Sequence, residues 1–137
     1  MDLISAVMWL TLNIYHEARG EDQIGQIAVA HVTMNRVHNR NQSVKQVVLD
    51  PYQFSWTHTK EKWTPQNMEA LMECFESAVV AMGGHDFTQG ATHYHRIDVH
   101  PGWAKRMTFI GQLGSHYFYR KKMHLRAIKI KRKLLRK

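Results

Sequence analysis

The sequence predicts an α+β fold, mainly helical in its first two thirds, with a small antiparallel β-sheet toward the C-terminus. Apolar residues recur at helical spacings as far as Gly83-Gly84, and short apolar-aromatic runs between turn residues replace them from His85 onward. A length of 137 residues with 44% hydrophobic content suits one domain with a single core.

Capping signals divide the first half of the chain into three helices. Residues 3–16 form an apolar run predicted to be a buried helix that ends near Glu17. Asp22 is a suitable N-cap for a helix with apolar positions from Ile24 to Val37. Ser43 and Gln46 match a capping box, which predicts a short helix that stops before Pro51. The aperiodic residues 51–62 predict a loop.

A fourth helix is predicted to start at Thr64-Pro65 and to end at Gly83-Gly84, with Cys74 buried inside it. Its apolar stripe is expected to face the core and consists of Met68, Leu71, Met72, Phe75 and Val79. Strands are predicted over residues 91–97, 106–110 and 115–120, with residues 111–114 as a hairpin connection.

The charge of the chain is concentrated at its C-terminus. Residues 120–137 contain ten Lys and Arg and no acid, whereas the other 119 residues contain nine basic and eleven acidic residues, a balance of 9 − 11 = −2. The formal charge of +8 is therefore a property of the tail rather than of the body, residues 1–119.

Residues 120–137 are predicted to be a basic amphipathic tail and not a separate domain. On a helical wheel Met123, Ala127, Ile130 and Leu134 align, and the basic residues opposite them are Lys122, Arg126, Lys129, Lys133 and Arg136. Such a helix suits an anionic membrane or a lipopolysaccharide surface. A strand, a solvated tail and a sequence-blind nucleic-acid contact remain alternatives, although no specific nucleic-acid motif is present.

Glu17 is the first candidate for chemistry. It follows an apolar helix and precedes a turn containing Gly20, so its carboxyl is expected at the edge of a core. Burial raises the pKa of a carboxyl, and a neutral carboxylic acid can protonate a glycosidic oxygen. On spacing alone, a structural role remains open, in which Glu17 pairs with Arg19 or caps the next helix.

Four blocks in order resemble the SleB/CwlJ-type cell-wall hydrolases over roughly residues 6–119. The first block is EARGE at 17–21 with GQIAVA at 25–30 and NRV at 35–37, and the second is VV at 47–48 with YQFS at 52–55. The third is DFTQGATHYH at 86–95, and the fourth is Trp103 with IG at 110–111 and HYFY at 116–119. The family usually has proline directly after the aspartate that corresponds to Asp86, and this chain has Phe87 there.

The resemblance implies a lysozyme-like fold and an enzyme that cleaves peptidoglycan between N-acetylmuramic acid and N-acetylglucosamine, with Glu17 as the catalytic acid. Family members commonly act as lytic transglycosylases, in which one carboxyl serves first as acid and then as base. Hydrolysis of the muramidase type would need a second carboxylate, for which Glu21 and Asp86 are the candidates. The residues expected to bind substrate are Gln53, Phe54, Ser55, Trp56, Thr88, His93, Tyr94, Trp103, His116 and Tyr119.

A rival interpretation is a zinc-dependent amidase of the wall. His93 and His95 would face the same way in a strand, with Asp98, His100 and His116 nearby in sequence. No His-Glu-x-x-His motif and no cysteine pair accompany them, so we expect no metal and no cofactor. A scaffold for a cationic membrane- or nucleic-acid-binding tail is the alternative from a different class.

The biological setting expected from the resemblance is a monomeric phage endolysin that lyses a Gram-negative host. The apolar run at residues 3–12 is preceded by Asp2 and lacks a small-residue cleavage site, which is unlike a signal peptide. We therefore expect synthesis in the host cytoplasm, release through a pore-forming holin and action on the wall in the periplasm.

Overall fold

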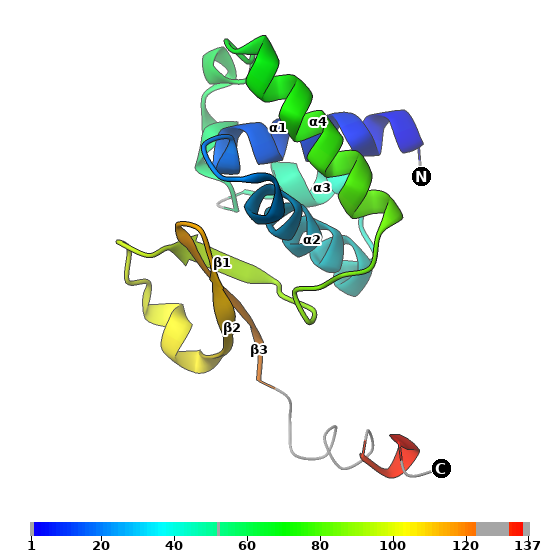
Figure 1. The fold of residues 1–137 in the computed structure, drawn as a ribbon, viewed down its shortest axis with the longest axis vertical. Coiled ribbons are helices and arrows are strands. Elements are labelled where there is room, and N and C mark those ends of the chain that lie inside the picture. The colour runs from blue at the N-terminus through cyan, green and yellow to red at the C-terminus, as the bar shows by residue number, and fades with distance from the viewer. Residues whose placement is uncertain (1, 52, 123–131, 136–137) are drawn as a thin grey trace.

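The computed structural model describes residues 2–51, 53–122 and 132–135, and it confirms the mainly helical α+β class. Four helices gather on one side of a small sheet (Figure 1). The helices are α1 (Leu3–Ala18), α2 (Gln23–Arg40), α3 (Val44–Leu49) and α4 (Met68–Gly83), and the strands are β1 (His93–Arg96), β2 (Met107–Leu113) and β3 (His116–Lys121). Three short 3-10 helices connect them, namely η1 (Ser55–His58), η2 (Lys60–Lys62) and η3 (Gly102–Arg106).

The predicted caps of α2 and α3 are confirmed. The Asp22 side chain accepts a hydrogen bond of 2.9 Å from the backbone N–H of Gly25. Ser43 and Gln46 exchange the two bonds of a capping box, at 3.1 and 2.8 Å. Since a capping bond reaches only three residues along the chain, these helix starts are visible in the sequence.

The predicted start of α4 at Thr64-Pro65 is wrong, and residues 51–62 are not all loop, because they include η1 and η2. The backbone N–H groups of Gln66 and Asn67 both donate to the hydroxyl of Tyr15 over 3.1 Å. Asn67 then caps α4 through the N–H of Ala70 at 3.0 Å. A contact from α1 therefore holds this segment in a non-helical turn, and α4 begins only at Met68.

The face that α4 buries differs from the predicted one except at Leu71, which is partly buried against the core. Met68, Met72 and Phe75 are 68%, 62% and 49% exposed, and Val79 is exposed as well. The buried positions are instead Cys74, Ser77, Ala78 and Ala81. Small side chains let α4 pack closely on α1 and α2, which leaves the larger apolar stripe facing outward.

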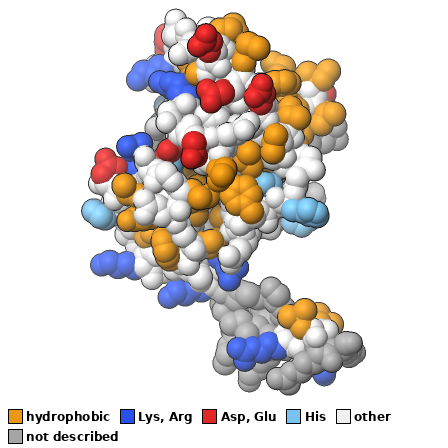
Figure 2. Space-filling model, viewed as in Figure 1, with side chains coloured by type: hydrophobic (Ala, Val, Ile, Leu, Met, Phe, Trp, Pro, Cys, Tyr) orange, Lys and Arg blue, Asp and Glu red, His pale blue; other side chains and the backbone are white. Residues whose placement is uncertain are grey.

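α1 contributes to the same outer surface, so its prediction as a buried helix holds for only one of its faces. Leu10 and Ile14 are fully buried, whereas Leu3, Ile4 and Met8 are exposed. A hollow of about 540 Å³ with apolar walls lies between α1 and α4. Figure 2 shows hydrophobic side chains gathered over this end of the molecule with acidic ones among them. No helix in the described part of the chain is long and apolar enough to cross a membrane.

The sheet is antiparallel with strand order β1-β3-β2. The hairpin connection is shorter than predicted, because β2 runs on to Leu113 through an irregularity between Phe109 and Gly111. Gly114 has a φ of 55°, and a Cβ there would lie 2.5 Å from a carboxylate oxygen of Glu21. Glycine is therefore required at this turn for two reasons, namely its positive φ and the close approach of the Glu21 side chain, which leaves no room for a Cβ.

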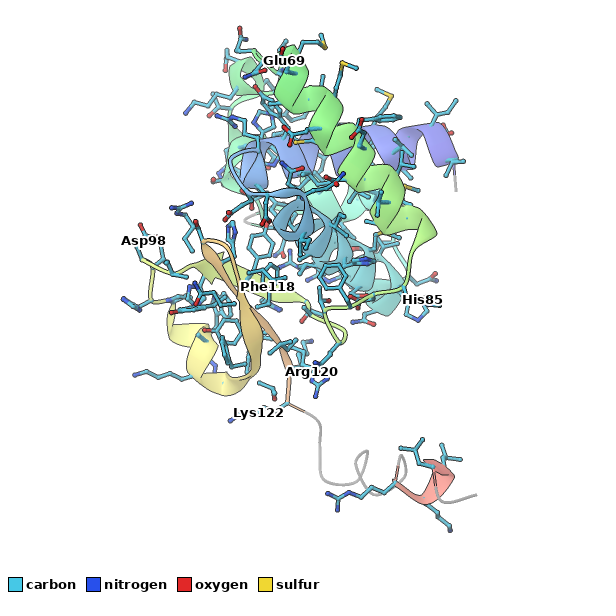
Figure 3. The ribbon with its side chains drawn as sticks, in the orientation of Figure 1. Glu69, His85, Asp98, Phe118, Arg120 and Lys122 are labelled. Atoms are coloured by element: carbon cyan, nitrogen blue, oxygen red, sulfur yellow. The ribbon has the colours of Figure 1, made fainter. Side chains whose placement is uncertain are left out.

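Alternation along the strands divides the aromatic residues between two faces. His116 and Phe118 of β3 are buried on the face toward the helices, and Figure 3 shows Phe118 between the sheet and α2. Tyr94 of β1 packs against the same core. The intervening residues His95, Tyr117 and Tyr119 lie on the outer face, where Trp103 of η3 contacts His95 and Tyr119, and His95 contacts Tyr117.

The tail prediction can be followed only in part. Met123, Arg126, Ala127, Lys129, Ile130 and Arg136 lie outside the described residues. Lys122 is exposed where the chain leaves the sheet (Figure 3), and residues 132–135, which include Lys133, are helical and exposed. Within them Leu134 is 64% and Leu135 is 77% exposed.

Candidate active site

Glu17 lies in the last turn of α1, half-buried where the helical part meets the sheet. Burial raises the pKa of its carboxyl above the ordinary value. Two nearby groups oppose that rise, a hydrogen bond from Tyr94 and the charge of Arg36. Burial thus favours the protonated carboxyl, while Tyr94 and Arg36 favour the ionised one.

Tyr94 is the hydrogen-bond donor to Glu17. Its hydroxyl donates to Oε1 over 2.8 Å, although 77 residues separate the two in sequence. Burial and the neighbouring carboxylate raise the pKa of Tyr94 well above 10.0, so the hydroxyl keeps its proton and remains a donor. The edge of its ring meets His116 at a centroid distance of 5.2 Å.

Glu21, one of the two predicted second carboxylates, is held by the hairpin between β2 and β3. Its Oε1 accepts from the backbone N–H of Ser115 at 2.9 Å and lies 2.9 Å from Nδ1 of His116. Burial lowers the pKa of His116, and the charge of Glu21 partly opposes this. The Glu21 carboxylate thus ties the turn between α1 and α2 to the sheet.

Arg36 is a buried cation that the sequence analysis did not select. Its Nε donates to the carbonyl of Thr92 at 2.7 Å, and Nη1 donates to the side chain of Gln53 at 3.1 Å. Its guanidinium also lies 5.4 Å from the centre of the Phe54 ring. Gln53 and Phe54 therefore orient Arg36, whose charge acts on Glu17. The NRV block at 35–37 could have indicated Arg36, but an arginine in a helix is ordinarily expected to be exposed to solvent.

A hollow of about 480 Å³ opens beside Glu17, with mostly polar walls formed by His16, Arg19, Glu21, Arg96, Ser115 and His116 around it. His16 stacks on Trp56 at 4.4 Å and its Nε2 lies 3.2 Å from the carbonyl of Trp63. Burial lowers the pKa of His16. The sequence analysis selected neither His16 nor Arg96, because nothing local marks a residue that lines a cleft.

A family model described as Cell Wall Hydrolase matches residues 20–119 of this chain. The chain belongs to the cell wall hydrolase family. Family membership makes it an enzyme of the bacterial wall, and it confirms the part of the predicted resemblance that concerns the family.

Relatives and solved structures agree with this family assignment. Spore cortex-lytic enzymes of Oceanobacillus iheyensis and Bacillus subtilis are 32% and 30% identical over 108 residues, or 77% of this chain. The chain spans only 38% and 34% of their lengths. The catalytic domain of the germination-specific lytic transglycosylase SleB from Bacillus anthracis superposes with a TM-score of 0.72 at 26% identity, covering 84% of this chain and 93% of that domain. The catalytic domain of Bacillus cereus SleB gives 0.72 at 27% identity, covering 84% and 89%.

The structure divides the family-derived binding residues into several groups. Tyr94 and His116 lie next to Glu17, and Gln53 and Phe54 reach it through Arg36. Ser55 is exposed at the start of η1. Trp56 is only 7% exposed and donates its N–H to Asn13 at 2.9 Å. We infer that Trp56 supports the cleft through His16 rather than stacking on a sugar.

His93, Trp103 and Tyr119 belong to the outer face of the sheet. Trp103 contacts the rings of His93 and Tyr119 at 5.1 and 5.4 Å. Since side chains alternate along β1, His93 points away from the face that carries Tyr94. Burial together with the positive charges of Arg36, Arg40 and Lys121 lowers the pKa of His93 to about 4. These three residues are not brought to Glu17.

Thr88 is buried in the loop that follows α4 and binds Asp86, the other candidate second carboxylate. Asp86 accepts from the N–H and hydroxyl of Thr88 at 2.7 and 2.5 Å, from Asn35 at 2.9 Å and from Gly90 at 3.0 Å. These bonds lower the pKa of Asp86. Asp86 therefore orders its loop, and Thr88 with Phe87 lines a separate hollow of about 230 Å³.

The histidines proposed for zinc have protein partners. His95 uses both ring nitrogens, Nδ1 toward the carbonyl of Arg96 at 2.7 Å and Nε2 toward the hydroxyl of Tyr119 at 2.9 Å. Nδ1 of His93 lies 3.0 Å from the hydroxyl of Thr92. Within residues 2–51, 53–122 and 132–135, no three His, Cys, Asp or Glu side chains are grouped to hold a metal ion.

Proposed function

We propose that the chain is a lytic transglycosylase that cleaves peptidoglycan strands between N-acetylmuramic acid and N-acetylglucosamine, with Glu17 as acid and then base. The observation that carries this proposal is the isolation of the Glu17 carboxyl. It lies in a polar hollow with a donor at 2.8 Å, while Glu21 and Asp86 are both engaged elsewhere. The likeness to a solved lytic transglycosylase domain supports the same chemistry.

In the first step, protonated Glu17 gives its proton to the glycosidic oxygen as the bond to the anomeric carbon of muramic acid breaks. The raised pKa of Glu17 keeps part of the carboxyl protonated at higher pH than an exposed glutamate allows. The sugar ring acquires oxocarbenium character, and the freed N-acetylglucosamine end leaves with the proton.

In the second step, ionised Glu17 takes the proton of the 6-hydroxyl group of the same muramic acid, whose oxygen forms the new bond to the anomeric carbon. The product is a 1,6-anhydro ring, and Glu17 returns to its protonated form, so the cycle consumes no water. The hydrogen bond from Tyr94 and the charge of Arg36 favour the ionised state that this step needs.

The alternative is hydrolysis of the muramidase type, in which a second carboxylate activates water or attacks the sugar. Glu21 would have to leave Ser115 and His116, and Asp86 would have to leave its four hydrogen-bond donors. Either change costs bonds to a charged group, each worth about 1.5–3 kcal/mol. The transglycosylase route requires no such rearrangement.

Replacing Glu17 with glutamine tests the assignment, because the amide keeps the shape of the side chain and cannot transfer the proton. We expect the rate on purified peptidoglycan to fall by about 10²- to 10⁴-fold with unchanged thermal unfolding. Mass spectrometry of wild-type products should show 1,6-anhydromuramic ends. Reducing ends would establish hydrolysis, freed stem peptides would establish an amidase, and a fully active Glu17→Gln variant would overturn the role of Glu17.

For the setting, we propose a monomeric phage endolysin that is made in the cytoplasm of a Gram-negative host and reaches the periplasmic wall through a holin. The basic residues 122–137 support a contact with anionic membrane or lipopolysaccharide surfaces. In this arrangement the folded body cuts the glycan strand and the tail increases its concentration at the envelope.

A further inference from the structure

Two arginines stand at the hollow beside Glu17 without a role in the cleavage steps. Arg19 follows α1 as its C-cap, and Arg96 is the last residue of β1. They come from opposite sides of the cleft, one from the helical part and one from the sheet. A substrate that enters the hollow therefore meets a guanidinium group on each side.

Arg19 is oriented by its own helix. Its Nη1 donates to the carbonyl of Tyr15 over 3.1 Å, and its guanidinium lies 4.8 Å from the centre of the Tyr15 ring. Arginine has five N–H donors in a planar fork, so most of them remain for another acceptor. The side chain is thus held in place while much of its binding capacity is unused.

Arg96 is held more loosely at the rim. Its Nε lies 3.3 Å from a carboxylate oxygen of Asp98, and the two side chains are 59% and 69% exposed. Figure 3 shows Asp98 at the outer edge of the sheet. An ion pair this exposed is weak and exchangeable, so a carboxylate on a bound substrate can replace Asp98 or share the guanidinium with it.

The other titratable groups at the hollow are His16, His116, Glu17 and Glu21. His16 is uncharged near neutral pH, because burial lowers its pKa. Glu21 faces His116 and the N–H of Ser115. Glu17 is neutral whenever it carries the proton for the first step. Arg19 and Arg96 are therefore the lining residues of this hollow that combine a positive charge with N–H donors for an anionic group.

The sugars of a peptidoglycan strand are neutral, and its carboxylates lie on the substituent of muramic acid, either on the lactyl group or on the attached peptide. We propose that Arg19 and Arg96 form a subsite for such a carboxylate, which selects strands by the substituent next to the scissile bond. This inference rests on the proposed function. Bidentate bonds from arginine to a carboxylate supply both the affinity and the orientation.

The test compares KM on three substrates, namely peptide-bearing strands, the same strands with their carboxylates converted to methylamides, and strands stripped of peptide by an amidase. We expect wild-type KM to be about tenfold higher on the methylamide, the equivalent of one charge-assisted bond, with kcat unchanged. The stripped strand distinguishes the two sources, because removal of the peptide frees the lactyl carboxylate, which is an amide in both peptide-bearing strands. A low KM there assigns the lactyl group, and a high KM assigns the peptide.

Arg96→Gln should raise KM on native strands about threefold to tenfold and remove the difference between native and methylamide strands. Arg19→Gln should act in the same direction, and Arg96→Lys should restore part of the effect. Asp98→Asn is the decisive comparison with Arg96→Gln, because it removes the ion-pair partner of Arg96 and should leave KM equal or lower. If the Arg96–Asp98 pair were only structural, both variants would behave alike. Arg106→Gln, at an exposed arginine outside the hollow, is the matched control.

Equal wild-type KM values on all three strands would overturn the subsite, as would an equal loss by Arg96→Gln on all three. Failure of the proposed function looks different, because wild type would then cleave none of the three substrates or give products without anhydro ends.

Discussion

Tyr94 and Glu17 define the candidate site at the scale of single residues. Tyr94 donates to the carboxyl, and the burial that raises the pKa of Glu17 also keeps Tyr94 protonated. The hydrogen bond favours the ionised carboxyl and therefore lowers its pKa. Tyr94 thus acts on the acid–base chemistry by touching Glu17, a role distinct from the substrate contact predicted for it.

Tyr94→Phe removes this hydrogen bond and retains the ring. Because the lost bond favours the ionised form, the pKa of Glu17 should rise further, and the alkaline limb of the kcat/KM profile should move to higher pH. The maximal rate should fall by about 10- to 100-fold, the worth of one hydrogen bond to a charged group. Tyr117→Phe, on the outer face of the sheet, is the control. An alkaline limb that stays in place would contradict this role.

At the scale of elements, long-range contacts set where segments start and how they are tied together. The hydroxyl of Tyr15 holds the N–H groups of Gln66 and Asn67, which delays α4. Glu21 similarly joins the turn before α2 to the hairpin at Ser115. The cleft walls are therefore connected by a few polar contacts between segments distant in sequence.

The corrected start of α4 gives a measurable difference between two caps. Asn67→Ala should lower the free energy of unfolding by about 1 kcal/mol, because it removes the bond to the N–H of Ala70. Thr64→Ala should change it by less than about 0.5 kcal/mol, since Thr64 caps no helix. Urea unfolding measures both through the midpoint at constant slope. Equal losses would restore Thr64-Pro65 as the helix start.

At the scale of the whole molecule, residues from the helical part and from the sheet line the hollow at Glu17. The last strand, β3, ends at Lys121 on the sheet side (Figure 1). The body of the chain is nearly neutral, and the positive charge lies in residues 120–137. Cleavage and attachment to an anionic surface therefore belong to separate parts of the chain in the function we propose.

Deleting residues 122–137 tests this separation. The variant should cleave isolated peptidoglycan within about twofold of the full chain, and it should lose binding to vesicles that contain anionic lipid. Each lysine or arginine near such a surface contributes about 1 kcal/mol, and the segment holds eight of them. Added salt should weaken the binding of the full chain. Zwitterionic vesicles are the control, and loss of cleavage on isolated peptidoglycan would contradict the separation.

The sequence by itself determined the features that depend on neighbouring residues. The caps at Asp22 and Ser43, the end of α4 at Gly83 and the charge of the tail all follow from patterns a few residues long. The family blocks also pointed to Glu17, which lies at the cleft. Interactions between residues three or four positions apart can be predicted from the sequence, because both partners lie in the same short segment.

Only the tertiary structure decided which partner each functional group has. The Glu17–Tyr94 and Glu21–Ser115 bonds span 77 and 94 positions. The outward stripe of α4 and the outer-face position of Trp103 likewise depend on how elements pack. Periodicity identifies an apolar face, but it does not say whether small or large side chains meet the neighbouring helix. Packing makes that choice, and packing also places the carboxyl of Glu17 beside the polar hollow with Tyr94 as its donor.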